Sequence, residues 1–366
     1  MCYNYKNTVY GRHRFSPWRI EEEQGVPWRY AGTQYRRNRR MAVKTWKICL
    51  SAVLLGAASA GILAGCGGAG GSGKMKVGVV QIVQHPALDE ANKGFTEALA
   101  KRGLSDKIEI DQQNAQGDQS NLRSIANRFV SGKYALIGAI STPAAQAMAN
   151  ATGEIPIVCT AVTNYETAKL MKSEAAPDGN VTGTSDVNPL EKEVDLIRAI
   201  QPGVKNIGII YNSSEINSVI QAKKLNEICQ PLGIAVKERT VNSINDIQQV
   251  AESFAGQVEA IYVPTDNVVA SSIPTLMAVA NANKIPVYGA EVGHVKNGVL
   301  ASVSISYYDI GYQAGEMAAD ILEGKKKVAD LPVESASKST LYINKEEMNA
   351  LGIAIPASVL DKATII

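Results

Sequence analysis

Residues 76–83 read KVGVVQIV, an almost unbroken run of apolar and β-branched residues. Such a run predicts a strand that is buried on both faces of a parallel sheet. After the turn Gln84-His85-Pro86, apolar residues recur at helical spacing over 89–101, which predicts a helix, and Gly103 is its expected C-terminal cap. In open α/β sheets, ligands bind where such strands end.

The same alternation of strand and helix continues along the chain. Strands are expected at 76–83, 108–114, 135–140, 155–162, 181–185, 206–211, 235–240, 260–263, 286–289, 298–306 and 340–343. Helices are expected between them, among them 119–131, 142–152, 190–200, 214–230, 244–254 and 309–323. This order predicts an α/β protein with two doubly wound, Rossmann-like lobes.

The two halves of the alternation resemble each other. Each begins with a strand, a polar turn, a helix, a glycine (Gly103 or Gly233) and a second strand. We assign residues 75–185 plus 307–335 to the first lobe, and residues 186–306 plus 336–366 to the second. The chain then passes between the lobes three times, which predicts a hinge with three crossings.

Composition excludes some classes of partner. The chain has 366 residues and a formal net charge of +2, but residues 1–66 hold 11 Lys and Arg and 3 Glu. The remainder carries 26 basic and 32 acidic residues, and this acidic balance gives no reason to expect nucleic-acid binding. Cys159 and Cys229 lie in apolar surroundings, so we expect core residues rather than a disulfide or metal site, and no cofactor.

Residues 1–40 differ from the rest, being rich in Arg, Tyr and Trp without apolar periodicity. One interpretation is a basic arm that binds nucleic acid or membrane. We favour a non-native upstream extension, because a complete secretory signal begins at Met41.

Residues 41–66 have the order of a bacterial lipoprotein signal peptide. Lys44 and Lys47 precede an apolar stretch, 48–62, which is shorter than the roughly 20 residues that span a bilayer. LAGC at 63–66 matches a lipobox, which predicts that Cys66 carries lipid; the alternative is a plain signal peptide with an incidental cysteine. With 67–74 as a Gly/Ser-rich tether, the protein is expected at the extracytoplasmic face of the cell membrane.

Three polar turns follow apolar strands. Ser141-Thr142-Pro143 has the residues of a helix start, whose free N–H groups suit a carboxylate. Turns 213–217 (SSEIN) and 264–267 (PTDN) occupy comparable places in the second lobe. Each turn has an ordinary capping explanation, but their shared position at strand ends favours a cleft that binds a ligand.

Longer motifs identify a family. VGVVQIVQHPALDEANKGF (77–95), NAQGDQS (114–120), STPAAQAMA (141–149), NVTGTSDVNP (180–189), YNSSEINS (211–218) and VPTDNVVASS (263–272) together resemble the substrate-binding lipoproteins of ABC transporters for tryptophan and related aromatic amino acids. This resemblance implies the fold of class I periplasmic binding proteins, a monomer, a free amino acid held between the lobes, and delivery to a membrane permease and its ATPase.

The resemblance also implies roles for residues. Ser141 and Thr142 are candidates for the ligand carboxylate, and Asp266, Asp309 and Glu215 for its ammonium group. The ligand side chain is expected near two residues of the first turn, Gln84 and His85. Further candidates at the strand ends are Thr163, Asn164, Asp186, Ser214, Asn217, Asn267 and Glu291.

The chain departs from the family at two places beside the expected cleft. Asn164-Tyr165 stands where relatives often have Asp-Pro, and Tyr165 is expected to stack on a ligand ring or to cover the rim. Asp186-Val187-Asn188-Pro189 stands where relatives often have Asp-His-Asn-Pro.

Other classes of function are less consistent with the residues. His85 and His294, the histidines outside the leader, lie in no nucleophile or metal motif, and no glycine-rich phosphate loop follows the first strand, so we expect no enzyme. A transcription regulator would need a DNA-binding headpiece where the lipobox lies. A nucleoside- or other small-solute-binding lipoprotein and a surface adhesin remain as alternatives.

Overall fold

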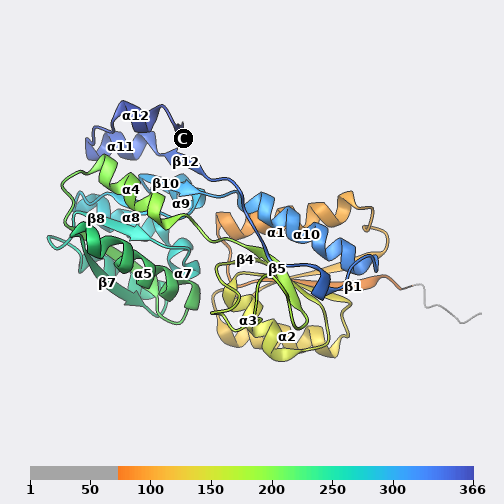
Figure 1. Ribbon diagram of the computed structural model, residues 1–366. Helices are drawn as coiled ribbons and strands as arrows, with labels where there is room; N and C mark the ends of the chain where they lie inside the picture. The colour runs from red at the N-terminus through yellow and green to blue at the C-terminus, as the bar shows by residue number, and fades with distance from the viewer. Residues whose placement is uncertain (1–72) are drawn as a thin grey trace, which may run out of the picture. The chain divides into compact units, whose positions relative to one another are not determined.

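The computed structural model describes residues 73–366, and Figure 1 shows their two sheets and the helices around them. The two sheets have six and seven strands, each flanked by helices. Both sheets have non-consecutive neighbours that are joined by helical crossovers, so the predicted doubly wound α/β class is confirmed.

The first sheet consists of parallel strands in the order β11-β5-β4-β3-β1-β2. These strands are β1 (Met75–Gln81), β2 (Ile108–Asn114), β3 (Leu136–Ile140), β4 (Ile157–Val162), β5 (Val181–Ser185) and β11 (Glu334–Ser335). Its helices are α1 (Pro86–Lys101), α2 (Gln119–Ser131), α3 (Thr142–Ala151) and α10 (Tyr307–Leu322). The central strand β3 is buried along its whole length, as its unbroken apolar sequence requires.

The second sheet has the order β13-β12-β10-β9-β8-β6-β7, with only β12 antiparallel to its neighbour β10. Its strands are β6 (Asn206–Asn212), β7 (Ala235–Val241), β8 (Ala260–Val263), β9 (Val287–Gly289), β10 (Ala301–Ser304), β12 (Thr340–Ile343) and β13 (Ala363–Ile365). Its helices are α4 (Leu190–Ile200), α5 (Ile216–Cys229), α6 (Ile247–Glu252), α7 (Asn267–Ala270), α8 (Ile273–Ala282), α9 (Val292–Lys296), α11 (Lys345–Leu351) and α12 (Ala357–Leu360). Short 3₁₀ segments lie at Gln230–Leu232, Ile244–Asp246 and Val328–Asp330.

The chain passes between the two sheets three times, as predicted. The first crossing follows β5, the second lies between β10 and α10, and the third joins β11 to β12. Because α10 begins directly after the second crossing, the packing of α10 against the first lobe holds this end of the hinge in place.

Glycines hold α10 close to α1. A Cβ on Gly311 would lie 2.0 Å from the backbone oxygen of Ala91, and one on Gly94 would lie 2.2 Å from that of Tyr308. The two helix backbones therefore touch at distances that no side chain permits.

Several sequence expectations need correction. Helix α1 begins at Pro86, not at 89, because His85 is the N-cap and proline suits the first turn. The expected helix at 244–254 is a 3₁₀ turn followed by the short α6, and the expected strand at 298–306 shortens to β10. Helix α8 was not predicted, since its sequence IPTLMAVANA is apolar on most sides.

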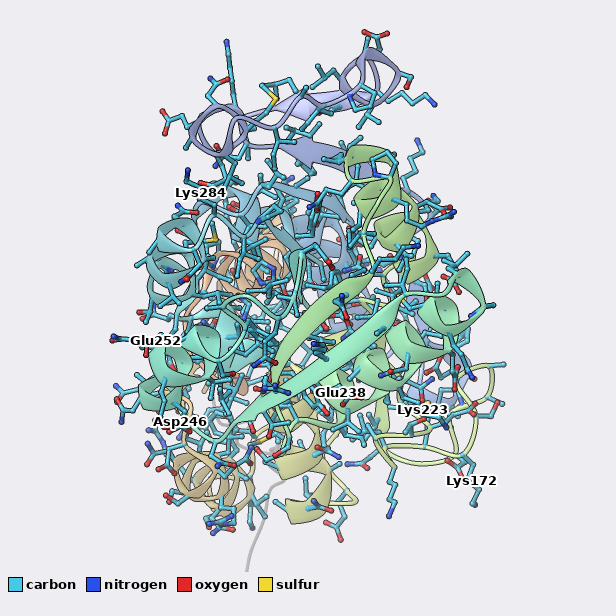
Figure 2. The ribbon with its side chains drawn as sticks, turned by 90° about the vertical axis from the view of Figure 1, so that its left-hand side faces the viewer. Lys172, Lys223, Glu238, Asp246, Glu252 and Lys284 are labelled. Carbon is cyan, nitrogen blue, oxygen red and sulfur yellow. The ribbon has the colours of Figure 1, made fainter. Side chains whose placement is uncertain are left out.

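Cys159 and Cys229 are buried and unpaired, as expected for core residues. The upstream extension, the signal peptide, Cys66 and the tether up to residue 72 lie outside the described residues. Between residues 73 and 366, no helix is both long and apolar enough to cross a bilayer. Charged side chains such as Lys172 and Lys223, labelled in Figure 2, are more than three-quarters exposed.

Candidate ligand-binding site

The two lobes meet through the turns at the carboxyl ends of their strands. His85, which caps α1 in the first lobe, lies with Nε2 3.3 Å from Oδ1 of Asn267 in the second lobe. The hydroxyls of Thr163 and Thr265 lie 3.4 Å apart across the same boundary. All four side chains are buried, so these contacts close a seam between the lobes.

Ser141 and Thr142 open α3 on the first-lobe side of the seam. Ser141 is the N-cap, and its Oγ accepts a hydrogen bond from the N–H of Ala144 at 3.3 Å. Thr142 is buried, and its hydroxyl has no partner among the described residues. The start of α3 therefore offers a free hydroxyl and a positive helix end, which together suit a carboxylate.

Two acids on the second-lobe side are held by dense hydrogen bonding. Asp266 accepts hydrogen bonds from the N–H groups of Asn212 at 2.6 Å and Val269 at 2.9 Å, and from the hydroxyl of Ser218 at 2.6 Å. Burial raises the pKa of the Asp266 carboxyl.

Glu215 accepts hydrogen bonds from the side-chain amides of Asn217, at 3.1 Å, and Asn267. Burial and the neighbouring Asp266 raise the pKa of Glu215 to about 8. The Oδ1 atom of Asn217 has no partner within residues 73–366, so this wall also presents a free acceptor.

A second pair of acids lies at the hinge side. Asp186, in the first crossing, accepts hydrogen bonds from Thr163 Oγ1 at 2.9 Å and from the Tyr307 hydroxyl at 3.0 Å. The same hydroxyl lies 3.4 Å from Oε1 of Glu291, which follows β9. Burial raises the pKa of both carboxyls, and that of Glu291 well above its ordinary value.

The two histidines of the seam are neutral. Burial lowers the pKa of His85 to about 4 and that of His294 to about 3. Oε2 of Glu291 lies 3.7 Å from His85 Nδ1 and 3.5 Å from His294 Nε2. In the described part of the chain, no group of three or more His, Cys, Asp or Glu is arranged to hold a metal ion.

The charge balance of the seam is unusual. Asp186, Glu215, Asp266 and Glu291 are each at most 3% exposed. Within residues 73–366, no Lys or Arg lies within salt-bridge distance of any of them, and only the neutral histidines approach Glu291. Buried carboxyl groups need a cation or protons, so this arrangement can bind a positively charged group.

Four expected residues lie outside this buried group. Gln84, Ser214 and Asp309 are exposed, and Asp309 lies in the first turn of α10. Asn164 is half-buried and accepts a hydrogen bond from Thr167 N–H within its own turn. Tyr165 neither stacks nor covers a rim: it is fully buried in the first lobe, where its hydroxyl donates to the Thr184 carbonyl at 2.9 Å.

The remaining candidates are all buried: His85, Ser141, Thr142, Thr163, Asp186, Glu215, Asn217, Asp266, Asn267 and Glu291. Sequence reasoning missed Tyr307 and Thr265 and gave no role to His294. The sequence could have pointed to Tyr307, because this residue begins the helix that follows the second crossing and therefore lies next to the hinge. Thr265 stood inside the quoted PTDN turn, but nothing in sequence shows that it faces Thr163.

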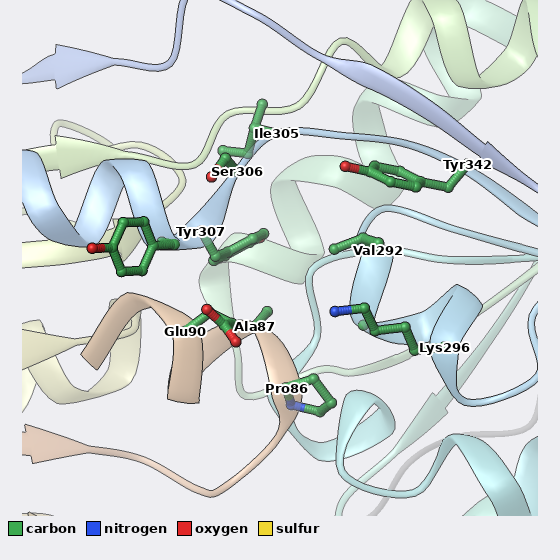
Figure 3. Close-up of a pocket in the computed structure, with 11 residues that line it drawn as sticks. Pro86, Ala87, Glu90, Val292, Lys296, Ile305, Ser306, Tyr307 and Tyr342 are labelled. Carbon is green, nitrogen blue, oxygen red and sulfur yellow. The ribbon is translucent and has the colours of Figure 1, made fainter. Parts of the chain in front are cut away.

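Two cavities flank the seam. One, of about 210 Å³, lies beside the hinge and is lined by α1, α9 and the second crossing, with Tyr342 from β12 and Lys296 at its edge (Figure 3). The other, of about 380 Å³, lies between 82–84 and 116–117 of the first lobe and 242–244 and 267–272 of the second. Both cavities take walls from the two lobes, so their shapes depend on the angle at the hinge.

A model of the ABC transporter substrate binding protein family matches residues 76–366 of this chain. The protein is an ABC transporter substrate-binding protein. It is 42% identical over 323 residues to the tyrosine-binding protein of Clostridioides difficile (strain R20291), covering 84% of this chain and 93% of that protein. This family membership confirms the resemblance drawn from the sequence motifs.

Two solved structures are similar to this substrate-binding protein. An ABC domain from Streptococcus pneumonia in complex with L-Trp superposes with a TM-score of 0.78 at 40% identity, covering 80% of this chain and 100% of that one. The ligand-free, open structure of a substrate-binding protein with adhesive properties from Clostridium difficile gives only 0.61 at 42% identity, covering 80% and 99%. At similar identity, the higher TM-score is that of the structure with L-Trp.

Proposed function

We propose that this substrate-binding protein captures a free L-amino acid with an aromatic side chain in the seam between its lobes. The observation that carries the proposal is the set of four buried carboxyls that have no Lys or Arg counterion among residues 73–366. A zwitterion supplies the missing cation through its ammonium group, and an anionic ligand such as a sugar phosphate does not.

The opposite end of the ligand belongs at α3. Among the described residues Thr142 offers an unpaired hydroxyl, and it lies at the positive end of α3. A carboxylate placed here is held without any arginine. The aromatic side chain is supported by the relatives, one a tyrosine-binding protein and one solved with L-Trp.

Binding closes the protein because the two halves of the site belong to different lobes. Thr142 lies on the first lobe, whereas Glu215, Asp266 and Glu291 lie on the second. Only the closed form satisfies both ends of the ligand, so the ligand shifts the equilibrium toward closure. The closed protein then delivers the amino acid to a membrane permease and its ATPase.

Isothermal titration calorimetry on the purified full-length protein tests the ligand class. L-Tryptophan, L-tyrosine and L-phenylalanine are compared with L-glutamate and with adenosine. We expect binding of at least one aromatic amino acid and none of glutamate. Binding of adenosine alone would favour the nucleoside-binding alternative, and binding of no aromatic amino acid would reject the proposal.

The anchor is a separate part of the proposal. We infer that Cys66 carries lipid and holds the protein at the extracytoplasmic face of the membrane, since the sequence at 63–66 matches a lipobox. Mass spectrometry of protein from the membrane fraction should detect a lipid adduct on Cys66, and Cys66→Ser should release the protein from that fraction. A variant that stays in the membrane would reject the anchor.

Adhesion is the second candidate function. It is favoured by the relative with adhesive properties at 42% identity. An assay of bacterial attachment to host cells, with and without competing free L-tyrosine, separates the two roles because adhesion through an outer surface does not need an empty seam.

A further inference from the structure

A ring of polar contacts, complete except at one link, runs around the seam. Its members are Thr163, Asp186, Tyr307, Glu291, His85, Asn267, Glu215, Asn217 and Thr265. Asn217 completes the second-lobe side by donating to the Thr265 carbonyl at 2.8 Å. Several links of the ring join the two lobes, among them His85 with Asn267 and Thr163 with Thr265.

One link of this ring is open. Nδ1 of His85 and Oε2 of Glu291 face each other at 3.7 Å, too far for a hydrogen bond. Both atoms are buried, and neither has a hydrogen-bond partner among the described residues. A buried pair of unpaired polar atoms on opposite lobes marks a place where a donor is missing.

The protons at this gap can be assigned. Asn267 donates its amide N–H to Glu215, so its Oδ1 must accept from His85 Nε2–H. A neutral imidazole has one N–H, and Nδ1 of His85 is therefore a bare acceptor. Between His85 and Glu291 the proton can come only from Glu291, whose carboxyl is kept protonated because burial and Asp186 raise its pKa. His294 Nε2, 3.5 Å from the same Glu291 oxygen, is the other polar neighbour of this gap.

Building on the proposed function, we propose that the ammonium group of the bound amino acid enters the gap between His85 and Glu291 and displaces the Glu291 proton into solvent. The O–H bond of the carboxylic acid breaks, its proton leaves to water, and the resulting carboxylate pairs with the ammonium. Each ligand bound thus releases one proton, and the affinity rises with pH.

The other titratable groups around Glu291 do not supply this proton. His85 and His294 are already neutral, and burial raises the pKa of Tyr307 and Tyr262 well above the ordinary value. Asp186, in the first crossing, accepts two hydrogen bonds that favour its ionised form.

Across the seam, Asp266 accepts hydrogen bonds from three donors, which favour its ionised form. Glu215 is the rival source, since its pKa is raised to about 8. Both of its oxygens, however, already accept hydrogen bonds inside the second lobe, so it faces no comparable gap.

Calorimetry counts the protons. L-Tryptophan is titrated into the full-length protein at pH 7 in two buffers of different ionisation enthalpy, and the difference in heat gives the number released. We expect about one proton, and an association constant that rises up to tenfold per pH unit between about pH 5.5 and 7.5. Indole-3-propionate has the same ring and carboxylate but no ammonium, and we expect it to release none, whether or not it binds.

Variants identify the source. Glu291→Gln should bind L-tryptophan without proton release and with an affinity independent of pH. Glu193→Gln is the matched control: Glu193 is also fully buried with a pKa raised to about 8, but it lies outside the ring, and release should persist. The proposal is overturned if the native protein releases no proton on binding, if Glu291→Gln releases as many, or if Glu215→Gln abolishes the release instead.

These outcomes are separate from failure of the proposed function, in which the native protein binds no aromatic amino acid at all. If Glu291→Gln does not fold, the same calorimetry with indole-3-propionate on the native protein tests the proposal. A proton released by this ligand would overturn it.

Discussion

The hydrogen bond between His85 and Asn267 is a direct probe of lobe closure. It joins residues 182 positions apart, at 3.3 Å, and its partners belong to different lobes. Separating the lobes breaks this bond, whereas the contacts of Asn267 with Glu215 lie within the second lobe and survive. We predict that His85→Phe and Asn267→Ala each weaken ligand binding, and that together they weaken it by less than the product of the two effects.

The magnitude follows from burial. In the closed form each single variant leaves the other partner without a hydrogen bond in a site where both are at most 6% exposed. An unpaired buried polar group costs about 1–3 kcal/mol, which raises Kd by about 5- to 150-fold. The double variant removes both partners, so the coupling energy between the two positions should be about 1 kcal/mol.

Calorimetry with L-tryptophan on the native protein, both single variants and the double variant measures this coupling. Asn226→Ala, on α5 and outside the seam, is the control for loss of an asparagine, and its Kd should match the native value. Strict additivity of the His85 and Asn267 effects would refute the view that this pair joins the lobes when ligand is bound.

Three further predictions concern the fold and its titration. Gly311→Ala should destabilise the protein by about 1–3 kcal/mol, seen as a lower Tm, because its Cβ would meet the backbone of α1, whereas Gly153→Ala, with nothing within 4 Å, should not. Asp309→Ala should leave Kd for L-tryptophan within about twofold, since a surface change of this kind costs less than about 0.5 kcal/mol; a larger loss would return Asp309 to the site. Burial raises the pKa of Glu193 to about 8. Above the ordinary pKa of a glutamate, the unfolded state loses this proton while the folded state keeps it, so the free energy of unfolding should fall as pH rises from about 5 to 8. Glu193 contributes up to about 1.4 kcal/mol per pH unit to this fall. Glu193→Gln keeps the acceptor for Val303 N–H and should lessen that slope, measured by urea unfolding at several pH values; an unchanged slope would contradict the assignment.

The sequence was sufficient for the architecture because local signals agree with one another along most of it. The strand at Val181–Ser185 and the helices Gln119–Ser131 and Leu190–Ile200 end at the residues predicted, because periodicity and flanking turns coincide there. The helix at 244–254 was wrong because its first turn is a 3₁₀ turn closed by the capping box of Ser243 and Asp246, a choice made by local side chains.

The site was predictable only where a residue's place in a turn fixes its direction. Ser141 and Thr142 follow directly from a cap after a buried strand. Asp309 was expected as an ammonium partner, but it follows Tyr307 by two positions on α10, so the two side chains leave the helix in nearly opposite directions, and Tyr307 is buried while Asp309 is exposed. Tyr165 was expected at a rim, and only the three-dimensional packing of β4 and β5 shows that it fills the core.

The most direct test of amino acid binding between the lobes is a crystal structure of this protein with L-tryptophan or L-tyrosine bound. We predict that the ligand carboxylate lies at Thr142 and the start of α3, and that the ammonium group lies between His85 and Glu291. A ligand whose carboxylate faces Glu291 and Asp186, or one bound outside the seam, would contradict it.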